Sequence, residues 1–226
     1  MVSSSKGATP PVEVGNAADW RRLEPTKLTP ILSASLDAFY EHGFHGTSVR
    51  DIARRVGVTV PALYYHHENK EAVLLALLEL STSDVLERAH AASADGGDDP
   101  VQRLANVIEA IVLRMTMRSR LAALESEVRY LSPENRQRYR IVRKGVEELV
   151  LEIVKEGKKR ELFDVADAAE TTRALLGMCQ SIPRWYHAEG KLTPDAVARK
   201  YVEIAMKTVG STELPVKPKK RRTADV

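Results

Sequence analysis

Residues 47–67 contain two short helix-forming segments separated by a glycine, and no other feature of the sequence constrains the fold as tightly. Thr47 or Ser48 can cap the first segment, and Gly57 ends it and permits a tight turn. Four apolar residues of this segment recur at the spacing of one helical face: Val49, Ile52, Ala53 and Val56. Thr59 can cap the second segment. The spacing predicts a helix-turn-helix, whose second helix can enter the major groove of DNA.

The remainder of the sequence also favours helices. Aromatic residues make up 5% of the chain, hydrophobic residues make up 43%, and the apolar residues recur at helical rather than alternating spacing. We therefore expect an all-α chain of about nine helices, in which an N-terminal three-helix helix-turn-helix domain precedes a C-terminal helical domain. The expected parts are a flexible N-terminal arm, a DNA-binding domain, a second domain connected through the fourth helix, and a basic disordered tail: 1–24, 25–70, 71–210 and 211–226.

Several classes of protein are disfavoured by what the sequence lacks. No apolar run approaches the roughly 20 residues that cross a bilayer, and the N-terminal segment has no apolar stretch typical of a secretion signal. The sequence contains a single cysteine, Cys179, and shows no metal-spaced cluster, nucleophile–base pair or glycine-rich phosphate loop. We therefore expect a soluble cytoplasmic protein that is not an enzyme and has no membrane partner, metal or cofactor.

Residues 31–78 carry a longer pattern, ILSASLDAFYEHGFHGTSVRDIARRVGVTVPALYYHHENKEAVLLALL. Its pieces GF (43–44), TSVRDIA (47–53), GV (57–58), LYYH (63–66) and NKEAV (69–73) closely resemble the N-terminal domain of the TetR family of bacterial transcriptional regulators. The resemblance runs without a gap and departs from the family pattern at His67, where an apolar residue is usual. His67 either loosens the packing behind the second helix or sits uncharged against it.

The resemblance implies that the helix-turn-helix contacts double-stranded operator DNA. Ser48 and Arg50 would contact phosphate or an adjacent base, and Lys70 would hold a phosphate at the start of the fourth helix. Four residues that open the recognition helix would read bases: Thr59, Val60, Pro61 and Ala62. Three residues that follow would bond phosphates or base edges: Tyr64, Tyr65 and His66. For either tyrosine, the alternative is a place in the core.

The resemblance also implies a ligand-sensing domain that forms a homodimer through the last two helices, at about 164–187 and 193–210. Residues 181–210 are similar to the end of this domain in family members that control lipid and acyl-CoA catabolism, so the expected effector is a fatty-acyl or steroid CoA thioester. Seven residues are candidates for the ligand pocket, with ordinary core positions as the alternative: Ile108, Ile111, Met115, Leu124, Tyr139, Val142 and Trp185. Five arginines are candidates for contacts with the ligand's phosphates, with solvated surface positions as the alternative: Arg114, Arg118, Arg138, Arg140 and Arg143.

Two functions follow from these patterns. The first is a repressor that binds a palindromic operator as a dimer and is released by a small, partly apolar effector. The alternative is a non-specific architectural DNA-binding protein, since the basic segment KPKKRR (217–222) would add salt-dependent affinity with little sequence readout. The net charge of only +3 does not favour either function.

Overall fold

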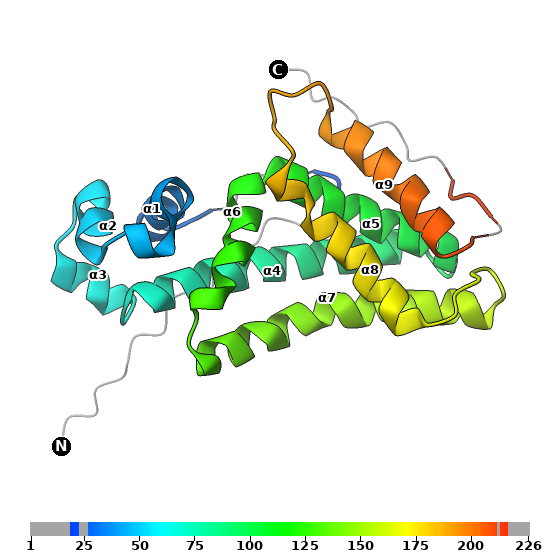
Figure 1. The fold of residues 1–226 in the computed structure, drawn as a ribbon, viewed down its shortest axis with the longest axis horizontal. Helices are drawn as coiled ribbons and strands as arrows, with labels where there is room; N and C mark the ends of the chain where they lie inside the picture. Colours follow the sequence, from blue (N-terminus) through cyan, green and yellow to red (C-terminus); the bar gives the residue numbers. More distant parts are fainter. Residues whose placement is uncertain (1–18, 23–26, 212, 217–226) are drawn as a thin grey trace.

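The structure, a computed structural model, describes residues 19–22, 27–211 and 213–216. Within these ranges it contains nine α-helices, two 3-10 helices and no strand, which confirms the predicted all-α class. Helices α1 to α3 form one end of the molecule, and α4 extends from them into the larger group formed by α5 to α9 (Figure 1). No helix of the described residues is long and apolar enough to span a membrane.

The first three helices follow the capping signals closely. Helix α1 (Pro30–Gly46) begins after Thr29, whose side chain accepts from the Leu32 N–H, and bends at Gly43, where φ is 69°. Helix α2 (Val49–Val56) begins with a reciprocal capping box between Ser48 and Asp51. Helix α3 (Val60–His66) has Thr59 as its N-cap, as predicted. The local sequence therefore determines both ends of the helix-turn-helix.

The larger part of the fold consists of longer helices. Helix α4 (Lys70–Asp95) is followed by α5 (Pro100–Met117), the short α6 (Ser119–Ala123) and the 3-10 helix η2 (Leu124–Tyr130). Helix α7 (Pro133–Lys159) precedes α8 (Ala168–Gln180), the 3-10 turn η3 (Ile182–Arg184) and α9 (Pro194–Thr208).

Two of these helices differ from the expected ranges. The sequence predicts that helix α4 ends near His90 and is followed by a loop over 92–100, but helix α4 continues to Asp95, so the connection to α5 is shorter. Helix α8 ends at Gln180 instead of continuing through a kink to His187. Pro183 lacks an N–H and its ring would clash with a helical carbonyl one turn earlier, so the chain tightens into η3.

The buried side chains form two hydrophobic cores. The smaller core joins α1, α2, α3 and the start of α4, and it includes the fully buried Ile52 and Leu63. Residues much later in the chain complete this core: Leu121, Leu124, Leu131 and Tyr139. The larger core lies among α4, α5, α7, α8 and α9. The segment from α6 to the start of α7 therefore packs with the N-terminal helices.

A short segment at the N-terminus packs against the larger core. Trp20 is 3% exposed and donates to Asp95 over 3.3 Å. Arg21 binds Glu109 at 3.1 Å and Asp95 at 3.3 Å. Residues 19–22 fall within the arm expected over 1–24, and the rest of that arm lies outside the described ranges. Residues 19–22 are thus anchored to α4 and α5.

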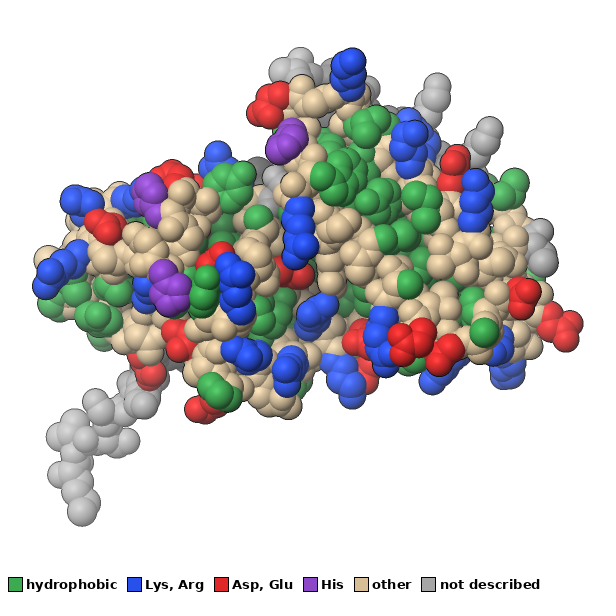
Figure 2. Space-filling model, viewed as in Figure 1, with side chains coloured by type: hydrophobic (Ala, Val, Ile, Leu, Met, Phe, Trp, Pro, Cys, Tyr) green, Lys and Arg blue, Asp and Glu red, His purple; other side chains and the backbone are tan. Residues whose placement is uncertain are grey.

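Large apolar side chains remain exposed on α9 and on the segment before it. Trp185 is 41% exposed, Ile204 is 46% exposed and Leu192 is 39% exposed. The Trp185 ring stacks on Tyr201, with centroids 6.3 Å apart. Apolar side chains gather on the α8–α9 side of the molecule in Figure 2. The opposite, inward face of α8 is used by the chain's own core, because Leu175 and Cys179 are fully buried there.

Candidate functional site

The helix-turn-helix is held together from inside. Leu63 and Ile52 have no exposed surface, and Ala53 is 3% exposed where α2 and α3 approach each other. Gly57 adopts φ 78°, a left-handed conformation that favours glycine, and its N–H donates to the Ala53 carbonyl. The apolar faces point inward, so the outer face of α3 is available to a partner.

The structure brings the predicted DNA-contacting residues to the surface of one end of the molecule. Tyr64 is 47% exposed and Tyr65 is 83% exposed, so neither tyrosine belongs to the core. The other exposed members of the predicted set are Ser48, Arg50, Thr59, Pro61, Ala62 and His66, and Val60 is half-buried. Their roles in DNA binding stay predictions, since no DNA is present.

Lys70 has a contact that sequence reasoning missed. Its Nζ donates to the carbonyls of Phe44 at 2.6 Å and Thr47 at 2.7 Å, and it lies 4.3 Å from the Phe44 ring centroid. Burial lowers the pKa of Lys70. The ammonium therefore ties α4 to the turn between α1 and α2, and one N–H is left for a phosphate.

His67 is the C-cap of α3 and is half-buried. Burial lowers its pKa, and the neighbouring His66 lowers it further. Between the two alternatives for this residue, the structure favours an uncharged imidazole packed behind the recognition helix.

A cavity of about 520 Å³ lies among α4, α5, η2, α7 and α8, a size typical of small-molecule sites. Its apolar lining comes from five residues: Val85, Ile111, Met115, Val146 and Leu176. Its basic lining comes from four: Arg140, Arg143, Lys144 and Arg173. Thr82, Glu125, Glu147, Gly177 and Gln180 complete it. The cavity therefore combines an apolar interior with several cations.

The basic side chains differ in how they are engaged. Arg143 donates to the Gln180 side chain at 2.9 Å, and Lys144 pairs with Glu148 at 3.0 Å. Arg173 pairs with Glu170 and lies 3.9 Å from Glu147. Arg140 is exposed and makes no hydrogen bond or ion pair with any described residue. At least this guanidinium group is available to an anion.

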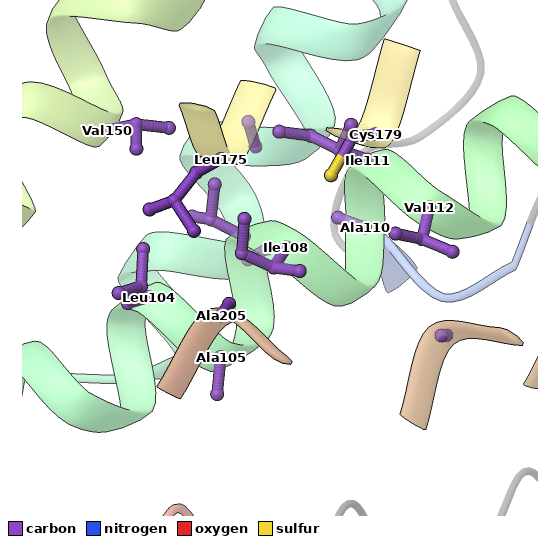
Figure 3. Close-up of a cluster of buried hydrophobic side chains, with 14 of the residues drawn as sticks. Leu104, Ala105, Ile108, Ala110, Ile111, Val112, Val150, Leu175, Cys179 and Ala205 are labelled. Atoms are coloured by element: carbon purple, nitrogen blue, oxygen red, sulfur yellow. The ribbon is translucent and has the colours of Figure 1, made fainter. Parts of the chain in front are cut away.

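The predicted pocket residues divide into three groups. Ile111 and Met115 line the cavity, while Ile108 and Leu124 are core residues. Figure 3 shows Ile108 and Ile111 of α5 in the larger core, near Leu175 and Cys179 of α8. Tyr139 is also buried, and its hydroxyl contacts two cavity-lining residues. Val142 and Trp185 do not line the cavity, because Val142 is half-buried elsewhere on α7 and Trp185 stacks on Tyr201 at the surface.

The cavity has a polar end that the sequence did not reveal. Thr82 Oγ1 donates to the Tyr139 hydroxyl at 3.3 Å, and that hydroxyl lies 3.5 Å from Glu125 Oε1. Burial raises the pKa of Glu125. No residue spacing marks this group, because its members come from α4, η2 and α7.

Three of the five candidate arginines are held in ion pairs. Arg114 and Arg118 bind the buried Asp84 at 2.6 Å and 3.1 Å, and Arg138 binds Glu79 on α4 at 2.6 Å. Arg88 binds the same aspartate at 3.0 Å. Asp84 is thus the centre of an ion cluster that joins α4 to α5.

The segment η2 connects the cavity with the N-terminal helices. Glu125 lines the cavity, and two residues further on Glu127 Oε2 accepts from the Phe44 N–H at 3.1 Å. Tyr130 stacks on the Phe44 ring with centroids 5.9 Å apart. Two residues of chain and one hydrogen bond therefore connect Glu125 with the turn that precedes α2.

Comparisons with known proteins agree with this arrangement. Residues 31–77 match the family described as bacterial regulatory proteins, tetR family, and residues 97–209 match the tetracyclin repressor-like C-terminal domain. The transcriptional repressor KstR2 of Rhodococcus jostii (strain RHA1) is 29% identical over 207 residues, which span 89% of this chain and 97% of KstR2.

Two solved structures are similar along most of the chain. PfmR, a TetR family transcriptional regulator from Thermus thermophilus, aligns with a TM-score of 0.70 and 28% identity, over 81% of this chain and 98% of PfmR. AibR, in complex with isovaleryl coenzyme A and operator DNA, aligns with a TM-score of 0.70 and 25% identity, over 77% of this chain and 95% of AibR.

The fold, the exposed recognition helix and the family matches together define a DNA-binding transcriptional regulator of the helix-turn-helix class. The chain belongs to the TetR family. Its N-terminal domain is the helix-turn-helix domain of that family, and its C-terminal domain is of the tetracycline-repressor type.

Proposed function

We propose that this regulator is a repressor that binds a palindromic operator as a homodimer and leaves it when a CoA thioester occupies the cavity. The outward face of α3 is the observation that supports DNA binding in this proposal. Leu63 is fully buried while Tyr64, Tyr65 and His66 beside it are exposed, as a recognition helix requires.

A dimer would place two such helices in successive major grooves, roughly 34–36 Å apart. The exposed apolar side chains of Trp185, Leu192 and Ile204 support α9 and the segment between α8 and α9 as the interface. Hydrophobic side chains of this size on one face are typical of a surface that is buried in an assembly.

The effector proposal draws on the chemistry of the cavity. Its apolar lining fits a fatty-acyl or steroid body, and Arg140 and Arg143 fit the phosphates of coenzyme A. AibR supports this class of ligand, since it was solved with isovaleryl coenzyme A. A 100-fold loss of operator affinity needs about 2.7 kcal/mol of preferential ligand binding to the released conformation.

The first experiment recovers bound duplexes from a random DNA pool at near-physiological salt. Wild type should select a palindrome, Tyr64→Ala should lose it, and Ile141→Ala, which alters an exposed residue of α7, should keep it. Recovery of no motif, with binding that disappears as salt rises, would favour the architectural alternative.

The recovered operator then serves as the probe for the effector. Acyl-CoA and steroid-CoA thioesters should release it, and free CoA should release it poorly. The double variant Arg140→Ala/Arg143→Ala should weaken release by up to about tenfold. Arg138→Ala is the matched control, because Arg138 lies on the same helix and binds Glu79. Equal effects of the two substitutions would contradict the phosphate role.

A further inference from the structure

The most informative unassigned group is the carboxyl of Glu125 at the polar end of the cavity. The cavity is otherwise lined on its inner side by aliphatic residues and a methionine, such as Val85, Ile111 and Met115. A carboxyl in such surroundings is costly unless it has hydrogen-bond partners. Among the described residues its one hydrogen bond is with the Tyr139 hydroxyl, at a long 3.5 Å.

The hydrogen bonds of this group run in one direction. A carboxylate only accepts, so the Tyr139 hydroxyl donates to Glu125, and that hydroxyl in turn accepts from Thr82. Thr82 and Tyr139 are 6% and 2% exposed, so both are fixed by the surrounding packing. Glu125 is therefore the terminal acceptor of the chain, and its second oxygen, which has no hydrogen-bond partner among the described residues, can accept one more hydrogen bond.

An unsubstituted alkyl chain is a poor occupant of this end. It would displace the water that hydrates the carboxyl and offer no hydrogen bond in exchange, which penalises binding. A cationic group is disfavoured by the arginines and lysine of the same cavity. A neutral hydroxyl avoids both penalties, because it donates a hydrogen bond to the carboxyl without adding positive charge.

We infer that the effector carries a hydroxyl group on its apolar portion, which donates to Glu125 and so distinguishes hydroxylated from unsubstituted acyl thioesters. This inference rests on the proposed thioester function and specifies the ligand of the same site. Thr82 and Tyr139 act as positioning residues that aim the Glu125 carboxyl. The anionic end of the ligand lies toward Arg140, which is exposed on α7.

The test uses the full-length protein bound to its fluorescent operator. Three matched series of acyl-CoA, with chains of eight to sixteen carbons, carry a terminal methyl group, a terminal hydroxyl or a terminal methyl ketone. At its best chain length the hydroxylated series should bind at least about tenfold more tightly than the other two, which corresponds to about 1.4 kcal/mol.

Variants assign the preference to the carboxyl. Glu125→Leu should reduce the preference for the hydroxylated series to within about twofold, and Tyr139→Phe should reduce this preference partly. Glu125→Gln should keep most of the preference, because the amide oxygen still accepts a hydrogen bond. Glu148→Gln, on the exposed face of α7, is the control. Thermal unfolding and operator affinity without ligand are measured first for each variant.

Each outcome decides a different point. Equal or tighter binding of the unsubstituted series would overturn this inference and leave the proposed function standing. Equal binding of the ketone series would also overturn it, because the carboxyl would then be donating. Failure of every series to release the operator would refute the thioester function and the hydroxyl inference with it. The wild-type comparison decides the question even if Glu125→Leu does not fold.

Discussion

The buried ion cluster around Asp84 contributes to the stability of the fold, and replacing Asp84 should lower the free energy of unfolding. Asp84 is 1% exposed and faces three guanidinium groups, those of Arg88, Arg114 and Arg118, at 3.0, 2.6 and 3.1 Å. Burial opposes ionisation of Asp84, but these three cations outweigh burial and hold its pKa below the ordinary value. The cluster joins α4 to α5 with a net positive charge.

The substitution Asp84→Asn keeps the shape of the side chain and removes its charge. Arg88 and Arg114 are 2% and 1% exposed, so they would remain buried without a counter-ion. Three contacts would persist, from Arg88 to the Arg22 carbonyl and from Arg114 to the Ser81 hydroxyl and the Arg118 carbonyl. Removing one partner of a buried ion pair typically costs about 3–5 kcal/mol. For a chain of this length each kcal/mol lowers Tm by about 2–4 °C, so the expected decrease is about 6–20 °C.

Thermal unfolding at pH 7 and at a fixed protein concentration measures this loss, since a dimer's Tm depends on concentration. Glu148→Gln removes an exposed pair with Lys144 and should cost less than about 1 kcal/mol. Because the folded pKa of Asp84 is depressed, its contribution is present above the unfolded pKa and disappears as pH falls through the folded pKa. The difference between wild type and Asp84→Asn should therefore shrink in acid. A Tm within about 2 °C of wild type at pH 7 would refute the reasoning.

Three further predictions follow from individual contacts. In Gly157→Ala the new Cβ would overlap the ring of the buried Phe163, so unfolding in urea should show a loss of about 1–3 kcal/mol, and an unchanged midpoint would contradict this packing. Trp20→Ala should cost about 3 kcal/mol by the same assay, because the ring is 3% exposed against α4 and α5; a loss below about 1 kcal/mol would show that the segment is not anchored. Arg50→Ala should lower the salt dependence of operator binding by about one phosphate contact. Lys70→Met should mainly lower thermal stability, because the Nζ of Lys70 is bound to two carbonyls. A larger salt effect for Lys70→Met than for Arg50→Ala would reverse these roles.

The DNA-binding end of the molecule could be predicted from the sequence because its signals are local. Ser48, Thr59 and Asn69 cap the helices that follow them, and each lies directly before an apolar period. Gly57 marks the turn because glycine readily adopts the left-handed backbone conformation found there. Such features depend on a few neighbouring residues, so the helix-turn-helix and the exposure of α3 follow from a short segment of sequence.

The cavity could not be predicted in the same way, because its residues meet only through long-range packing. Arg114 and Arg140 look alike in sequence, yet one is buried on Asp84 thirty positions earlier and the other faces solvent. The sequence makes Trp185 a candidate for the pocket on the expectation that α8 continues past Pro183. Helix α8 ends before Pro183 instead, and Trp185 lies at the surface, where its ring stacks on Tyr201. Glu125 carries no periodic signal, since it lies in a 3-10 segment.

Two elements that line the cavity meet at one residue of the DNA-binding domain, Phe44. Helix α4 reaches it through Lys70, whose Nζ binds the Phe44 carbonyl at 2.6 Å. The segment η2 reaches it through Glu127, which accepts from the Phe44 N–H at 3.1 Å, and through Tyr130, which stacks on its ring. Phe44 follows the bend in α1 and precedes the capping box of α2, so its position sets the direction in which α2 and α3 leave the core. In the proposed mechanism, a ligand that draws Glu125 inward would pull η2 away from Phe44, while a ligand that displaces α4 would move the other side of this residue. Either motion would act on the same turn, and in the proposed dimer it would take the two recognition helices out of register with the operator.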